Sequence, residues 1–60
     1  MKFEIRKSVS TTQPYYWRVV ATNGKVLATS ETYVNKADAT SAAQSVKTGA
    51  NAAPVLDLTS

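Results

Sequence analysis

The chain has 60 residues, with seven Lys and Arg against four Asp and Glu, and a formal net charge of +3. It contains no Cys and no His, which excludes disulfides, thiolate or imidazole metal sites and catalysis by a histidine base. We expect one small domain over residues 1–60 with a thin core, because nine of its apolar residues are alanine. No stretch has the length of a membrane span and no secretory signal opens the chain, so we expect a cytoplasmic protein.

The first half of the chain predicts two strands joined by a polar connection. Residues 2–7 alternate between apolar and charged side chains, which is typical of a half-buried strand. Residues 8–13 are rich in Ser and Thr and indicate a loop. Pro14 then opens a second strand at residues 15–22, since proline is tolerated at a first strand position.

Asn23-Gly24 is the strongest local signal in the sequence. It predicts a two-residue type I′ turn, with positive φ at both residues, leading into a third strand at residues 25–31. This turn sets Val20 opposite Leu27 and Val19 opposite Ala28. The two faces of the predicted hairpin are then Trp17, Val19, Ala21, Val26 and Ala28 on one side, and Tyr16, Arg18, Val20, Leu27 and Thr29 on the other.

A helix is expected from Lys36 to about residue 48. Asn35 is a good N-cap, and Asp38 places a carboxylate at the positive end of the helix. Gly49 is expected just after the helix, at the position where a left-handed residue commonly ends one. A stripe of small side chains at helical spacing is expected to lie against the sheet. It consists of Ala39, Ala42, Ala43 and Val46. The last residues, 55–59, are expected to form a short fourth strand.

Several segments together resemble the YegP-like family, small bacterial and archaeal proteins of unknown function. The resemblance rests on Tyr15-Tyr16-Trp17-Arg18-Val19-Val20-Ala21, Asn23-Gly24-Lys25-Val26-Leu27-Ala28, Ser30-Glu31-Thr32-Tyr33, Lys36-Ala37 and Ser45-Val46-Lys47. It implies an α+β fold made of a β-β-β-α-β unit. It also implies that two copies form one continuous sheet and exchange their C-terminal strands. It brings no catalytic residues, and Ala43 stands where the family usually has a bulkier residue.

Catalysis and metal binding find little support in the residues themselves. The four carboxylates are scattered along the chain, without the spacing of an acidic metal-binding loop. Ser and Thr are numerous, but no histidine base could activate them, and Gly24 and Gly49 form no phosphate-binding loop. We therefore expect a protein that is not an enzyme and holds no cofactor or metal.

Two functions of different kinds remain. The first is a structural or protein-interaction module that acts as a homodimer, with an unidentified protein partner. Its interface is predicted at Val20, Leu27, Val55, Leu56 and Leu58, large apolar residues without a cover from the single helix. The alternative is weak nucleic-acid binding by a basic, aromatic sheet face, provided that the exposed faces of the first two strands coincide. That face is predicted to consist of Lys2, Arg6, Tyr16 and Arg18.

Overall fold

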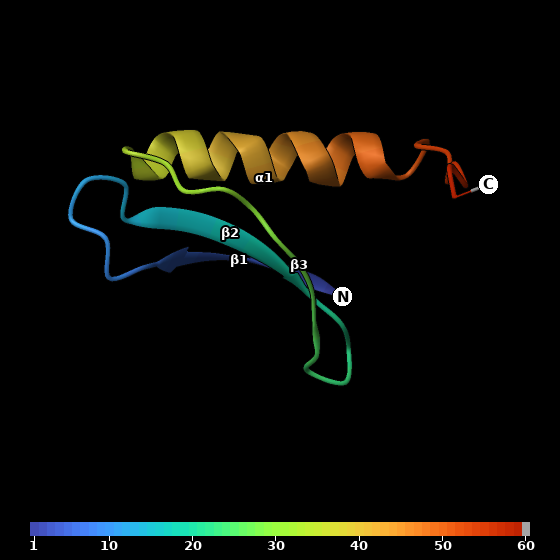
Figure 1. The fold of residues 1–60 in the computed structure, drawn as a ribbon, viewed down its shortest axis with the longest axis horizontal. Coiled ribbons are helices and arrows are strands. Elements are labelled where there is room, and N and C mark those ends of the chain that lie inside the picture. Colours follow the sequence, from blue (N-terminus) through green and yellow to red (C-terminus); the bar gives the residue numbers. More distant parts are fainter. Residues whose placement is uncertain (60) are drawn as a thin grey trace.

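A computed structural model describes residues 1–59 as an antiparallel sheet with one helix lying across one of its faces (Figure 1). The elements in chain order are β1 (Lys2–Lys7), β2 (Tyr15–Val20), β3 (Val26–Thr29) and α1 (Lys36–Ala50). The sheet order is β1-β2-β3, so β2 is central and β1 and β3 are the edges. The expected α+β class, with an antiparallel meander followed by a helix, is confirmed.

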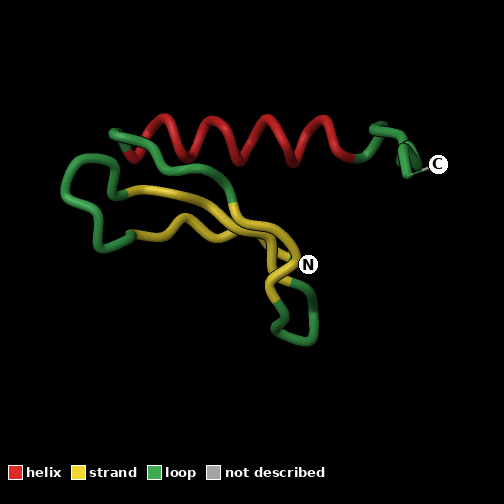
Figure 2. The backbone as a smooth tube through the Cα atoms, in the orientation of Figure 1, coloured by secondary structure: helices red, strands yellow, loops and turns green. Residues whose placement is uncertain are grey.

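The register of β1 against β2 decides which side chains face the helix. Phe3 lies opposite Val19, and Ile5 lies opposite Trp17. Directly opposed residues in a sheet point to the same face, so these four apolar side chains share one face. The rings of Phe3 and Trp17 pack together, with centroids 5.8 Å apart. Helix α1 covers this face, as the backbone trace in Figure 2 also shows.

The turn between β2 and β3 differs from the predicted type I′ turn. Gly24 has φ +89°, but Asn23 does not have positive φ. The Gly24 amide donates to the Ala21 carbonyl at 2.9 Å, and the Ala21 amide donates to the Lys25 carbonyl at 2.8 Å. The loop is therefore a β-turn followed by one left-handed glycine, the three-residue arrangement that produces a bulge. Only the glycine adopts positive φ at little cost, and the Asn23 side chain instead accepts a hydrogen bond from the Lys25 amide.

The bulge shifts the predicted register at one end of the hairpin. Val19 lies opposite Ala28, as predicted, but Val20 lies opposite Val26 instead of Leu27. The three-residue loop sets Val20 opposite Val26. The irregularity between Val19 and Val20 then leaves Leu27 as an extra residue on β3, since a bulge sets two residues of one strand against one of the other.

Helix α1 begins where the sequence predicts and ends later. Asn35 precedes it, but its side chain makes no capping bond to the helix backbone and instead donates to Asp38 Oδ2 at 3.4 Å. Gly49 lies inside the helix, which runs to Ala50, so the prediction that Gly49 follows the helix is wrong. The backbone keeps the right-handed helical conformation through Asn51. Pro54 lacks the backbone N–H group that a further helical turn would need as a hydrogen-bond donor.

The core is as thin as the composition predicts. Among residues 1–59 the buried apolar side chains are Val19, Val20, Ala39 and Ala43. Of the predicted helix stripe, Ala39 and Ala43 are buried, Ala42 is half-buried and Val46 is exposed. No helix in this part of the chain is long and apolar enough to cross a membrane.

The predicted fourth strand is absent from the single chain. Residues 55–59 have no regular secondary structure, and Val55 is 99% exposed. The chain leaves α1 beyond the end of the sheet, so the tail has no strand of its own chain beside it (Figure 1). The expected fourth strand therefore does not form within the single chain; Ser60 lies outside the described residues.

Candidate functional site

The sheet face away from the helix carries four charged side chains, those of Lys2, Glu4 and Arg6 on β1 and of Arg18 on β2. Glu4 lies opposite Arg18, and Arg6 lies opposite Tyr16. Lys2 is on the same face because it lies two residues from Glu4 on β1. The sequence left open whether the exposed faces of the two strands coincide, and the register shows that they do. All four residues of the predicted basic, aromatic face therefore lie together; we call this surface the charged face.

Glu4 lies at the centre of the charged face. Its Oε1 accepts a hydrogen bond from Arg18 Nε at 2.7 Å and lies 3.2 Å from Arg6 Nη1. Its Oε2 lies 3.4 Å from Lys2 Nζ. One carboxylate thus binds three cations of the predicted face. Glu4 is not among the residues that the sequence predicts for this face, because its role depends on the pairing of β1 with β2, which brings Arg18 across from it.

The pKa values of this cluster follow from its contacts. The hydrogen bond from Arg18, with smaller contributions from Arg6 and Lys2, holds the pKa of Glu4 below its ordinary value, although desolvation acts in the opposite direction. The pKa of Arg6 is raised, first by Glu4 and then by Tyr16. Glu4 and Arg6 are therefore both ionised at neutral pH.

The predicted dimer interface is divided between the sheet and the tail. Leu27 is 56% exposed on β3, whereas Leu56 and Leu58 are 70% and 85% exposed in the tail. Val20 is only 4% exposed, so its own chain already covers it and it offers little surface to a partner. The hairpin tip and the C-terminal tail lie far apart in the single chain (Figure 1).

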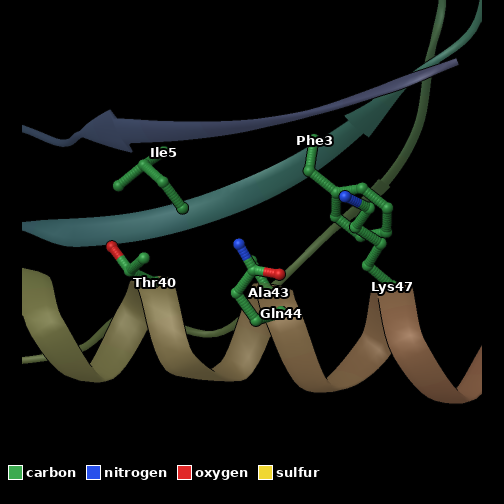
Figure 3. A pocket seen from close by; sticks show the side chains of 6 residues that line it. All are labelled: Phe3, Ile5, Thr40, Ala43, Gln44 and Lys47. Atoms are coloured by element: carbon green, nitrogen blue, oxygen red, sulfur yellow. The ribbon is translucent and has the colours of Figure 1, made fainter.

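A half-open cavity of about 120 Å³ lies between β1 and α1 (Figure 3). Phe3 and Ile5 point into it from β1 towards the helix, and Ala43 closes it from α1. Polar side chains of α1 line the rest of it, namely Thr40, Gln44 and Lys47. The cavity is therefore apolar on its sheet side, with polar groups contributed by the helix.

The segment after β3 holds the end of the sheet together. The Ser30 hydroxyl accepts a hydrogen bond from the Trp17 amide at 3.0 Å, and the Ser30 amide donates to the Trp17 carbonyl at 2.9 Å. Three residues later, Tyr33 forms an isolated bridge with Tyr15. These contacts give Ser30-Glu31-Thr32-Tyr33 a role in extending the pairing along β2 towards the helix.

No group of three or more carboxylates that could hold a metal ion gathers within residues 1–59. Glu4, the acidic residue with the most contacts, is bound to cations on the sheet. The surface features that remain in this part of the chain are the charged face, the cavity and the exposed tail.

The comparison with protein families finds a match over most of the chain. A family model described as "Domain of unknown function (DUF1508)" matches residues 11–57, most of the chain. This family is that of the YegP-like domains, so the resemblance seen in the sequence is confirmed. No curated protein and no solved structure matches the chain.

Proposed function

The chain belongs to the DUF1508 family of YegP-like domains, and we propose that it is a small, non-enzymatic interaction module that acts as a homodimer. The observation that carries this proposal is the C-terminal tail. Three of its six residues between 54 and 59 are large and apolar, and all three are exposed: Val55, Leu56 and Leu58. Apolar surface of this kind, gathered in one segment, is typical of a protein–protein contact.

The thin core supports the same proposal. Half of the buried apolar side chains within residues 1–59 are alanines, which bury little area. Domains of this size often need a further source of stability, and this chain has no cysteine for a disulfide. A second copy that covers the tail of the first, and offers its own tail in return, supplies that stability through a two-fold contact.

Sedimentation velocity over a range of protein concentrations tests this function. We expect the full chain to shift from monomer to dimer as its concentration rises. The Leu56→Asn/Leu58→Asn variant should remain monomeric over the same range, because it keeps the tail but removes its two leucines. A control variant, Val9→Asn, changes an exposed apolar residue in the loop before β2 and should dimerise normally. A full chain that stays monomeric at every concentration contradicts the proposal.

The alternative function is weak nucleic-acid binding by the charged face. The register favours it, since Tyr16 and three cations lie on one surface. Glu4 opposes it, because its carboxylate occupies the same cations that phosphates would need. Filter binding with single-stranded nucleic acid at several salt concentrations tests this alternative. If the charged face binds phosphate, Glu4→Gln should tighten binding and Arg18→Gln should weaken it; salt-independent retention contradicts this alternative.

A further inference from the structure

We propose that the cavity between β1 and α1 is a binding site for a small monocarboxylate with a short apolar chain. The apolar chain lies against Phe3 and Ile5, and the carboxylate accepts hydrogen bonds from Gln44 and Lys47. This ligand site goes beyond the proposed homodimer and does not depend on it. Three features of the described residues support it: an apolar wall, a cationic rim and the size of the space.

The sheet side of the cavity is an apolar wall that the helix leaves uncovered. Phe3 and Ile5 are two residues apart on β1, so they share one face of the strand, and both point towards α1 (Figure 3). Ile5 is 37% exposed although it lies on the helix-covered face, because the buried helix residue that meets the cavity is the small Ala43. A ligand chain that covers this wall removes apolar surface from water.

The helix side of the cavity is a polar rim with one cation. Thr40, Gln44 and Lys47 follow one another at spacings of four and three residues, so they lie on one stripe of α1 (Figure 3). The Thr40 hydroxyl donates to the Lys36 carbonyl at 2.9 Å, which leaves the amide of Gln44 and the ammonium group of Lys47 as donors towards a ligand.

The charge of Lys47 is not neutralised by its own chain within residues 1–59. The ion pairs in this part of the chain join Glu4 to cations on the opposite face of the sheet. An anionic group at the rim therefore complements Lys47, and hydrogen bonds between ionised partners are the stronger ones. A carboxylate suits a rim with one cation, whereas a doubly charged phosphate meets three cations on the charged face.

The size of the cavity limits the apolar part of the ligand. Its volume is about 120 Å³, and it is half open to solvent. A cavity of roughly 150 Å³ in another protein binds benzene, so this one accommodates one short alkyl chain and not a long acyl chain. Binding in so small and open a site is expected to be weak, in the millimolar range.

Trp17 provides the signal for a titration of the full chain. It is the single tryptophan of the sequence, and its ring packs against Phe3, with centroids 5.8 Å apart. Sodium hexanoate, added at constant ionic strength, should change its fluorescence with saturation. Acetate has the carboxylate without the chain, and hexanol has the chain without the carboxylate. Each should bind about tenfold more weakly than hexanoate or less tightly still, because each makes only half of the contacts.

Substitutions of the rim test the carboxylate contact. Lys47→Gln should lower the affinity for hexanoate about tenfold and leave the affinity for hexanol unchanged, whereas Lys47→Arg should retain hexanoate binding. The matched control is Lys36→Gln, which removes a cation of the same helix outside the cavity and should leave both affinities unchanged.

Substitutions of the wall test the apolar contact. Ile5→Ala should weaken hexanoate and hexanol alike, because it removes part of the apolar surface that both ligands cover. Val26→Ala, an exposed position on β3, is the matched control and should weaken neither. Circular dichroism shows whether each variant keeps the fold of the natural chain.

Amide NMR shifts in the full chain locate the bound hexanoate. Shifts gathered around Phe3, Ile5 and α1 support the site. Shifts centred on the charged face, or an affinity that ignores both Lys47→Gln and Ile5→Ala, overturn it. If the natural chain does not bind hexanoate but the Leu56→Asn/Leu58→Asn variant does, the tail covers the cavity and the ligand site is overturned. The homodimer is judged separately, by its sedimentation without ligand.

Discussion

Trp17 occupies the centre of the helix-covered face of the sheet, between Ile5 on β1 and Ser30 after β3. Its ring packs against Phe3, and its Nε1 is buried without a hydrogen-bond partner among residues 1–59. A buried donor without a partner costs stability, so the contribution of this side chain comes from its apolar area and not from its N–H group.

Substitutions at Trp17 should therefore separate these two contributions. Trp17→Ala should lower the free energy of unfolding by about 3–5 kcal/mol, which is comparable to the whole stability of so small a domain. Trp17→Phe removes the unpaired N–H and keeps an aromatic ring beside Phe3, so it should cost much less. Urea unfolding followed by circular dichroism measures both. An alanine variant with the midpoint of the natural chain would show that the ring is not part of the core.

Glu4 gives the charged face a dependence on pH. Its pKa is lowered in the folded chain, mainly by Arg18, so its contribution to stability is full above the ordinary glutamate pKa. This contribution is lost as the pH falls through the lowered value, where the carboxylate becomes protonated. We expect the urea midpoint to fall with acidification below about pH 4.5 and Glu4→Gln to flatten this fall.

The pKa of Asp57 is lowered as well, so Asp57→Asn provides the matched comparison for the same pH window. If Glu4→Gln and the natural chain lose stability in parallel on acidification, the cluster around Glu4 does not govern the acid response.

At the scale of elements, the hairpin shows that the sequence predicts the position of the turn but not the type of loop. The Asn23-Gly24 dipeptide locates the turn, and the predicted pairing of Val19 with Ala28 is present in the sheet. The loop type is not fixed by those two residues, because a two-residue turn and a three-residue turn with a bulge both accept glycine at the same position. In the structure, the Lys25 amide donates a hydrogen bond to the Asn23 side chain, and this bond accompanies the three-residue turn.

Gly24 should be sensitive to substitution for a backbone reason. It has φ +89°, and a Cβ at this position would meet no atom within 4 Å. Any loss of stability therefore comes from the left-handed backbone and not from crowding. Gly24→Val should cost more than about 1 kcal/mol, whereas Gly24→Asn should cost less, because Asn tolerates positive φ. Equal urea midpoints for the two variants would contradict this explanation.

Gly49 should respond in the opposite direction. It lies within α1, without positive φ, and a Cβ there also meets no atom within 4 Å. Gly49→Ala should therefore stabilise the chain by about 0.5–1 kcal/mol, since glycine in a helix interior is less favourable than alanine. Thermal unfolding by circular dichroism measures the gain. A loss of stability would show that the helix ends before residue 49, as its sequence pattern alone suggests.

On the scale of the whole molecule, the sequence predicts the order of the three strands and the helix, but it leaves open whether the exposed faces of β1 and β2 coincide in the charged face. It does not predict the centre of that face, since Glu4 and Arg18 are 14 residues apart and meet only through strand pairing. Nor does it place the tail. Alternating apolar residues after Pro54 indicate a strand, but a strand needs a neighbour, and the single chain provides none beside residues 55–59.

Removing residues 54–60 tests whether the tail completes the molecule. If dimerisation stabilises the fold, the urea midpoint of the full chain rises with protein concentration, because mass action favours the bound state. The truncated chain loses this dependence, and we expect it to be a largely unfolded monomer, since its core consists of a few small side chains. Circular dichroism with light scattering on both chains measures folding and mass together. A folded monomer would show that the tail is dispensable, and a folded dimer would place the interface elsewhere on the sheet.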